Sequence, residues 1–277
     1  MAKVLSVSSQ VVYGHVGNST ASFVLQRMGH EVMSLPTVLL SNRPGYAAIA
    51  GEPIGPEKLD AMLEAAGRNG WLAGVDAVLT GYIPTAEHAA LCEKWIGALG
   101  PGVLYVCDPI IGDDPGGVYI GEEAAHAIRE RLVPLAGVLT PNLFELGWLS
   151  GRAIGNTLAA VEAARSLERP AVIATSAPAD GPGMLANLLI EPDGVAACVS
   201  PRETVHAHGT GDFLAAIFLA HRLNGLSNRE ALQAAAAGMG AVLAASKGRQ
   251  ELALIETQEA WARQPPPLVP LEPVPPR

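Results

Sequence analysis

The segment His208-Gly209-Thr210-Gly211-Asp212-Phe213-Leu214-Ala215-Ala216 places two glycines and a carboxylate directly before an apolar, alanine-rich stretch. Glycine lets the backbone approach a ligand closely, with dihedral angles that other residues avoid. The stretch from 211 to 223 is predicted to be a helix, whose first N–H groups are unpaired and whose N-terminus carries about half a positive elementary charge. The segment therefore predicts an anion site suited to a phosphate group.

Asp212 has two interpretations on the residues alone. A carboxylate in the first turn of this helix could accept a proton from an incoming hydroxyl group. It could equally well do no more than cap the helix. Short Gly-Thr-Gly-Asp strings are not rare, so the segment by itself leaves both interpretations open.

Outside this segment, short β-rich runs alternate with helical stretches. The strands are predicted at residues 3–7, 31–35, 38–41, 77–80, 103–107, 137–140, 171–175, 185–190 and 195–200, and the helices at residues 18–28, 56–67, 85–99, 122–132, 159–167, 211–223, 228–246 and 257–264. This alternation predicts an α/β fold with a central, mostly parallel sheet covered by helices on both faces. Ligands bind such sheets at the carboxyl ends of the strands, where the polar, glycine-rich segments fall.

One domain is predicted over residues 1–264, because no internal repeat or linker interrupts the pattern. Residues 265–277 hold seven prolines and form a proline-rich C-terminal tail. Proline-rich segments with few large apolar side chains adopt polyproline-like or disordered conformations. We therefore expect the tail to be poorly ordered.

The composition excludes several classes of protein. The net charge is −9 and no basic cluster occurs, so a nucleic-acid surface is not expected. No run of about 20 apolar residues is present, which argues against a transmembrane helix. The apolar run at the N-terminus is too short for a signal peptide, and we expect a cytoplasmic protein. The sequence has three cysteines without a CxxC pair, so neither a zinc site nor a disulfide framework is predicted.

Residues 209–212, followed by Phe-Leu-Ala-Ala, resemble the signature of ribokinase-like kinases. Further segments resemble pyridoxal kinases in the same order along the chain, at residues 9–19, 40–42, 80–82, 107–113 and 140–146. The resemblance implies a ribokinase-like, single-domain fold. It also implies an ATP-dependent phosphotransferase that acts on an alcohol group, the 5'-hydroxymethyl of pyridoxal and of pyridoxine or pyridoxamine. The product would be pyridoxal 5'-phosphate, formed in vitamin B6 salvage.

The resemblance also implies roles for individual residues. Asp212 would be the catalytic base, beside an anion hole formed by Gly209, Thr210 and Gly211. The implied substrate contacts are Ser9, Val16, Tyr82 and Asp212. The implied ATP-binding residues are Asp108, Thr140, Glu145, Thr175 and Val205, of which Asp108 and Glu145 would hold Mg²⁺. Thr140 and Thr175 would flank a candidate K⁺ site, residues 112–119 would form a flap over the active site, and the family implies a homodimer.

Most of these residues also have an ordinary structural interpretation. Ser9 could be a turn residue at the end of a strand, and Tyr82 a half-buried tyrosine. Asp108 could belong to a turn before Pro109. Glu145 could be a first-turn helix carboxylate favoured by the helix dipole. Only the order of several motifs along the chain favours the functional interpretation.

The segment Ser41-Asn42-Arg43-Pro44-Gly45-Tyr46 departs from the family pattern, in which His-Thr commonly follows Ser-Asn. Pro44 has neither a side-chain donor nor an amide hydrogen. We expect Arg43 to replace the lost contact and bind the substrate; the alternative is that Arg43 points to solvent and Pro44 stiffens a turn. The departure keeps open a second function, a hydroxymethylpyrimidine-type kinase of the same superfamily. A third hypothesis is a non-catalytic binder of vitamers or nucleotides that retains the fold, against which Asp212 and the complete glycine loop argue.

Overall fold

A large mixed sheet organises the computed structural model, which describes residues 1–179, 181–203, 205, 207–263 and 271–273. Within these residues the strands of this sheet are β1 (Lys3–Tyr13), β2 (Glu31–Asn42), β3 (Gly51–Pro53), β4 (Ala77–Thr80), β5 (Leu104–Cys107), β8 (Val138–Leu139), β9 (Ala171–Pro178), β10 (Met184–Glu191), β11 (Gly194–Pro201) and β12 (Leu271–Pro273). Their order is β12-β11-β10-β9-β8-β5-β4-β1-β2-β3. The six strands from β9 to β2 pair in parallel, and the outer strands pair antiparallel. The predicted mostly parallel sheet is confirmed.

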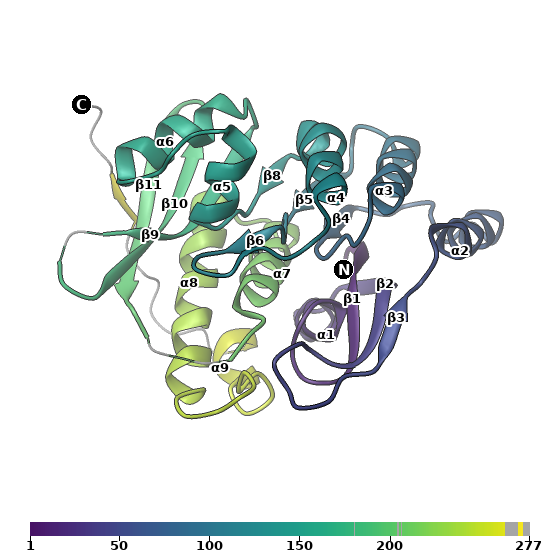
Figure 1. Cartoon of the computed structure of the whole chain (residues 1–277), viewed down its shortest axis with the longest axis horizontal. Helices are drawn as coiled ribbons and strands as arrows, with labels where there is room; N and C mark the ends of the chain where they lie inside the picture. Colours follow the sequence, from purple (N-terminus) through teal and green to yellow (C-terminus); the bar gives the residue numbers. More distant parts are fainter. Residues whose placement is uncertain (180, 204, 206, 264–270, 274–277) are drawn as a thin grey trace.

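Helices cover both faces of the sheet (Figure 1). One face carries α1 (Asn18–Arg27), α7 (Thr210–Leu223), α8 (Asn228–Ala245) and α9 (Gln258–Ala262). The other carries α2 (Pro56–Arg68), α3 (Ala86–Leu99), α4 (Glu122–Ala127), α5 (Leu143–Ser150) and α6 (Thr157–Ser166). Each face has its own buried apolar cluster, as a parallel sheet requires when both of its faces are covered. In the part of the chain that the structure describes, no helix has the length and apolar character needed to span a membrane.

Two strands differ from the prediction. β1 continues to Tyr13 instead of ending at Val7, and β2 runs unbroken through Pro36 instead of forming two short strands. The register between the two strands shifts between Ser8 and Gln10, beside the Ser8–Pro36 pair. Proline cannot donate to the ladder and is tolerated at such irregularities. Pairing between distant strands therefore overrides the local polar and proline signals.

The helices also show local differences. The single helix predicted at residues 122–132 is α4 followed by a π-helical turn, Ile128–Leu132, and then a short 3₁₀ turn, Val133–Leu135. α5 was implied only by the first-turn interpretation of Glu145, and it is a two-turn helix with a complete capping box. The helix predicted at 257–264 is shorter, Gln258–Ala262.

The proline-rich tail contributes the edge strand β12, which pairs antiparallel with β11. Pro273 lies in this strand, and edge strands are where sheets accept proline. The predicted boundary between residues 264 and 265 lies outside the described residues, as do residues 265–270 and 274–277. The boundary and the disorder of the tail stay predictions.

Candidate active site

The anion loop, residues 208–212, leads into the N-terminus of α7. Gly209 is the N-cap residue with a φ of 93°, and a Cβ on it would lie 1.8 Å from the carbonyl oxygen of His15. Only glycine fits this position. The first backbone bond of the helix runs from the Phe213 N–H to the Gly209 carbonyl, at 2.9 Å. The N–H groups of residues 210–212 therefore lack partners within the helix, and the positive end of its dipole lies beside them.

A cavity of about 410 Å³ adjoins this loop. All five residues predicted to contact the substrate line it, namely Ser9, Val16, Arg43, Tyr82 and Asp212. They come from β1, the turn after it, the end of β2, the end of β4 and the start of α7. The fold thus brings the predicted acceptor residues together at the carboxyl ends of neighbouring parallel strands. We call this space the acceptor cavity.

Asp212 is half-buried and joins the two parts of the site, since it is the third residue of α7 and also lines the acceptor cavity. Burial raises the pKa of its carboxyl group from 3.8 to about 6, and a hydrogen bond from the Gly17 backbone N–H opposes this rise. A carboxylate with this pKa is a better proton acceptor than an ordinary aspartate and is still ionised near neutral pH. The capping interpretation of Asp212 is wrong, because the N-cap residue of α7 is Gly209; Asp212 can favour the helix only as a first-turn carboxylate near the positive end of the dipole.

A second carboxylate, Asp108, lies buried just after β5 and accepts a hydrogen bond from Thr140 Oγ1 at 3.0 Å. Burial raises the pKa of Asp108 well above its usual value, and the charges of Glu145 and Asp212 raise it further. The charges of two neighbouring carboxylates thus raise the free energy of the ionised form of Asp108. Such a cluster suits a cation, whose charge would reverse this repulsion.

Glu145 is held by backbone groups. Its Oε1 accepts from the N–H of Ile111 at 2.9 Å and of Gly112 at 3.4 Å, and its Oε2 accepts from the N–H of Asn142 at 3.0 Å. Burial raises its pKa to about 7, although these three N–H groups lower it. The last contact completes the capping box of α5. The helix interpretation of Glu145 is therefore correct, and the same carboxylate ties the start of the predicted flap to α5.

A metal ion at this site would depend on few protein ligands. Among the residues that the structure describes, no three His, Cys, Asp or Glu side chains are grouped so as to hold a metal ion. Mg²⁺ typically binds one or two carboxylates and takes its other ligands from phosphates and water. Asp108, with Glu145 beside it, fits that mode of binding.

Two of the remaining predicted ATP residues, Thr140 and Thr175, lie in or just after strands that are farther from β1 in the sheet. Thr140 follows β8, and Thr175 lies in the neighbouring strand β9, with its N–H bound to the Pro141 carbonyl at 2.9 Å. Three strands separate β9 from β1, which contributes Ser9. Val205 is half-buried and packs against the core on the α7 face. These residues extend the site away from the acceptor cavity, past Asp108.

The segment predicted as a flap forms a small hairpin of β6 (Gly112–Asp113) and β7 (Gly117–Val118). Asp113 and Tyr119, at its two ends, line the acceptor cavity. Burial raises the pKa of the Tyr119 phenol, and the neighbouring carboxylates raise it further. Tyr119 was not predicted as a site residue, and neither was His208, which also lines the cavity. Their only sequence signal was proximity to the glycines of the two loops.

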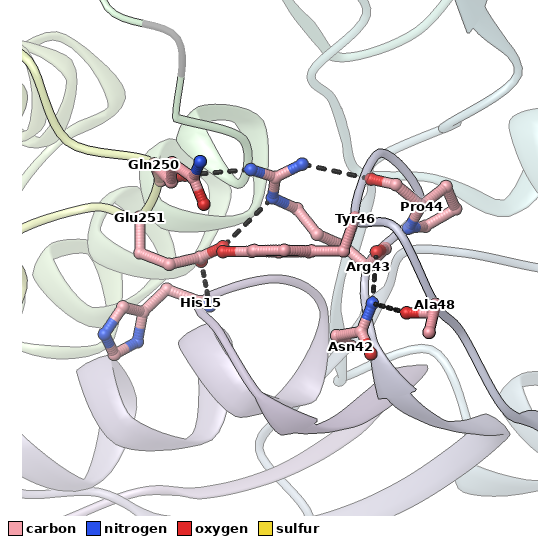
Figure 2. A network of polar contacts seen from close by, with 8 residues as sticks. All are labelled: His15, Asn42, Arg43, Pro44, Tyr46, Ala48, Gln250 and Glu251. Atoms are coloured by element: carbon pink, nitrogen blue, oxygen red, sulfur yellow. Dashed lines mark hydrogen bonds and ion pairs between the residues drawn. The ribbon is translucent and has the colours of Figure 1, made fainter.

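The structure rules out one of the two alternatives for Arg43. Its exposed fraction is only 8%, so the alternative in which it points to solvent is wrong. Its guanidinium group is turned toward the C-terminal segment and pairs with Glu251, which the sequence reasoning missed (Figure 2). The two residues are 208 positions apart along the chain, and no local signal connects them.

Known proteins resemble this chain over most of its length. The phosphomethylpyrimidine kinase family matches residues 24–250. The chain is 36% identical over 270 residues to "Pyridoxal kinase PdxY" of Leifsonia xyli subsp. xyli, covering 94% of this chain and 95% of that protein. The chain belongs to the pyridoxal kinase family.

Two further relatives of this family span most of the chain. A "Pyridoxine/pyridoxal/pyridoxamine kinase" of Bordetella avium is 38% identical over 252 residues, covering 88% of this chain and 85% of that protein. The structure of the pyridoxal kinase from Leishmania donovani, in complex with ADP and pyridoxamine, matches with a TM-score of 0.91 at 30% identity. It covers 99% of this chain and 100% of that chain.

Proposed function

We propose that this protein is an ATP-dependent kinase that phosphorylates the 5'-hydroxymethyl group of pyridoxal, and of pyridoxine or pyridoxamine, to give the 5'-phosphate in vitamin B6 salvage. The observation that carries the proposal is the position of Asp212. One carboxylate borders the acceptor cavity and belongs to the first turn of the phosphate-binding helix. The relatives named for pyridoxal kinase activity support this choice of substrate.

The reaction follows from these positions. The acceptor hydroxyl oxygen attacks the γ-phosphorus of ATP and forms a new O–P bond. The bond between the γ-phosphorus and the β,γ-bridging oxygen breaks, and ADP leaves with the electron pair. The hydroxyl proton passes to the Asp212 carboxylate. The N–H groups of residues 210–212 and the helix dipole stabilise negative charge on the phosphoryl oxygens.

Residues outside the cavity would bind the nucleotide. Asp108 and Glu145 would hold Mg²⁺, which supplies charge neutralisation to the phosphates when bound. Because both Glu145 oxygens accept backbone N–H groups, we propose that Asp108 is the direct ligand and that Glu145 acts through water. Thr140, Thr175 and Val205 would lie along the nucleotide, with K⁺ as a candidate ion near the two threonines.

The test is a turnover assay of the purified protein with MgATP against pyridoxal, pyridoxine, pyridoxamine and hydroxymethylpyrimidine. ADP release and the phosphorylated product, identified by mass spectrometry, are the readouts. We expect turnover of pyridoxal. Exclusive turnover of hydroxymethylpyrimidine would support the second candidate, which the family match at residues 24–250 keeps open. ATP binding without turnover of any acceptor would indicate a non-catalytic binder.

The homodimer and the cytoplasmic location belong to the same proposal. The homodimer is what the resemblance to the family implies, and the cytoplasmic location is the expectation set by the sequence. Light scattering of the purified protein measures the assembly directly, and a mass of two chains is the expected result. Cell fractionation with an antibody would locate the native protein.

A further inference from the structure

One wall of the acceptor cavity is built on a buried arginine, each of whose three side-chain nitrogens donates to a protein group. Arg43 Nε donates to Glu251 Oε1 at 3.1 Å, Nη2 to the Gln250 carbonyl at 2.9 Å, and Nη1 to the Pro44 carbonyl at 3.0 Å (Figure 2). The guanidinium carbon also lies 4.8 Å from the centre of the Tyr46 ring. Each of the three nitrogens thus has a protein partner, which leaves the side chain little freedom to turn toward a ligand.

The carboxylate of Glu251 joins its own segment to two others, residues 43–46 and residues 14–15. Its Oε1 accepts from Arg43 and, at 2.6 Å, from the Tyr46 hydroxyl group, while its Oε2 accepts from the backbone N–H of His15 at 2.9 Å. The Glu251 side chain is only 13% exposed. A buried ion pair is favourable only when further hydrogen bonds satisfy both partners, and here they do. We call Arg43, Tyr46, Glu251 and the His15 N–H the Glu251 clamp.

The His15 end of the clamp touches the anion loop. A Cβ on Gly14, whose φ is 112°, would lie 2.9 Å from Glu251 Oε2, and a Cβ on Gly209 would lie 1.8 Å from the His15 carbonyl oxygen. The backbone of residues 14–15 is therefore packed between Glu251 on one side and Gly209 on the other. A movement of Glu251 would reach the N-terminus of α7 through this contact.

We propose that the Glu251 clamp sets the position of the cavity wall at residues 43–46 relative to the anion loop, and that Arg43 and Glu251 are positioning residues for the phosphoryl acceptor. The inference rests on the proposed function. Arg43 acts through the backbone of Pro44 and the carboxylate of Glu251. The sequence predicted instead that Arg43 contacts the substrate directly.

The clamp predicts how a substitution at Glu251 changes the kinetics. Glu251→Gln keeps the size of the side chain but leaves the buried Arg43 without a counter-charge. We expect kcat/KM for pyridoxal to fall roughly 10- to 100-fold, because a displacement of about 1 Å at the reacting atoms has effects of this size. KM for ATP should rise less than KM for pyridoxal, because the proposed nucleotide residues Thr140 and Thr175 do not line the acceptor cavity.

A double-mutant cycle separates the clamp from a direct contact. In the clamp, Glu251→Gln and Arg43→Met remove the same interaction, so the double variant should be no worse than the more impaired single variant. Arg43→Lys should recover part of the activity, since it keeps the charge. If Arg43 instead binds the substrate itself, Arg43→Met alone should raise KM for pyridoxal while Glu251→Gln leaves it unchanged, and that outcome overturns the proposal.

Amide hydrogen exchange provides a readout that does not depend on turnover. In the full chain without ligand, Glu251→Gln should speed exchange in residues 14–17 and 43–48 at least tenfold, with α8 unaffected. The matched control is Arg249→Met, which breaks the exposed pair with Glu256 in the same segment and should change neither exchange nor kinetics. Unchanged exchange in Glu251→Gln overturns the clamp. Failure of the wild-type protein to phosphorylate pyridoxal would overturn only the proposed function.

Discussion

The phosphate side and the acceptor side of the cavity are built in different ways. The phosphate side is made by consecutive residues, 209–212, which present backbone N–H groups and one carboxylate at a helix terminus. The acceptor wall is made by side chains from segments that are 208 residues apart, joined at Glu251. A site made of backbone tolerates little change where the chain packs closely, as at Gly209. A wall made of paired side chains can be rebuilt without altering the reaction chemistry.

The largest expected effect is on the phosphate side. Asp212→Asn keeps the shape of the side chain and removes the base, and we expect kcat to fall roughly 10²- to 10⁴-fold, the range for loss of a general base. The Kd for ATP, measured by calorimetry, should change little. Near-normal turnover would mean that Asp212 is only a first-turn carboxylate of α7, and the contrast between a reactive side and a supporting wall would be lost.

Gly209→Ala tests whether the phosphate side depends on backbone geometry. The new Cβ would approach the His15 carbonyl oxygen to 1.8 Å, so the loop must move. We expect kcat/KM to fall on the order of 100-fold for either substrate. The matched control is Gly225→Ala, which has the same φ of 93° but no atom within 4 Å of the new Cβ. Equal effects of the two variants would show that backbone strain, and not the close approach, limits the loop.

The pH profile sharpens the comparison, because the proposed base lies on the phosphate side. The base must be ionised to accept a proton, and burial raises the pKa of Asp212 to about 6. Activity should therefore be lost as pH falls through about 6, about tenfold for each further pH unit. The measurement is kcat/KM for pyridoxal between pH 4.5 and 8. Full activity down to pH 4.5 would contradict the assignment of Asp212 as the base.

The smallest effect on activity is expected from removal of the C-terminal tail, which contributes the outer strand β12 of the sheet. Removal of residues 265–277 takes away β12, which pairs with β11 by a short antiparallel ladder at the sheet edge. We expect unchanged kinetics and a fall in Tm below about 4 °C, since 1 kcal/mol corresponds to about 2–4 °C in a chain of this size. Calorimetry of the truncated protein provides the measurement. A larger fall would show that the tail packs against the body of the protein.

Much of the fold could be predicted from the sequence, because buried parallel strands and their helices leave a local pattern. The strand at residues 77–80 has the predicted bounds, and α7 and α8 differ from prediction by one residue at one end. The prediction failed at β1 and β2, where serines and Pro36 resemble strand ends. The ladder between these strands is set by residues far apart in the chain, so local polarity could not reveal it.

The candidate site also has one part that the sequence could predict and one part that it could not. The sequence by itself determined the anion loop and the position of Asp212, because a glycine of positive φ followed by a helix N-terminus is a local conformation set by consecutive residues. Only the tertiary structure revealed the partners of the Arg43 side chain. Its counter-charge, Glu251, comes from the segment after α8, and an ion pair between such segments exists only once the fold has brought them within hydrogen-bonding distance and out of water.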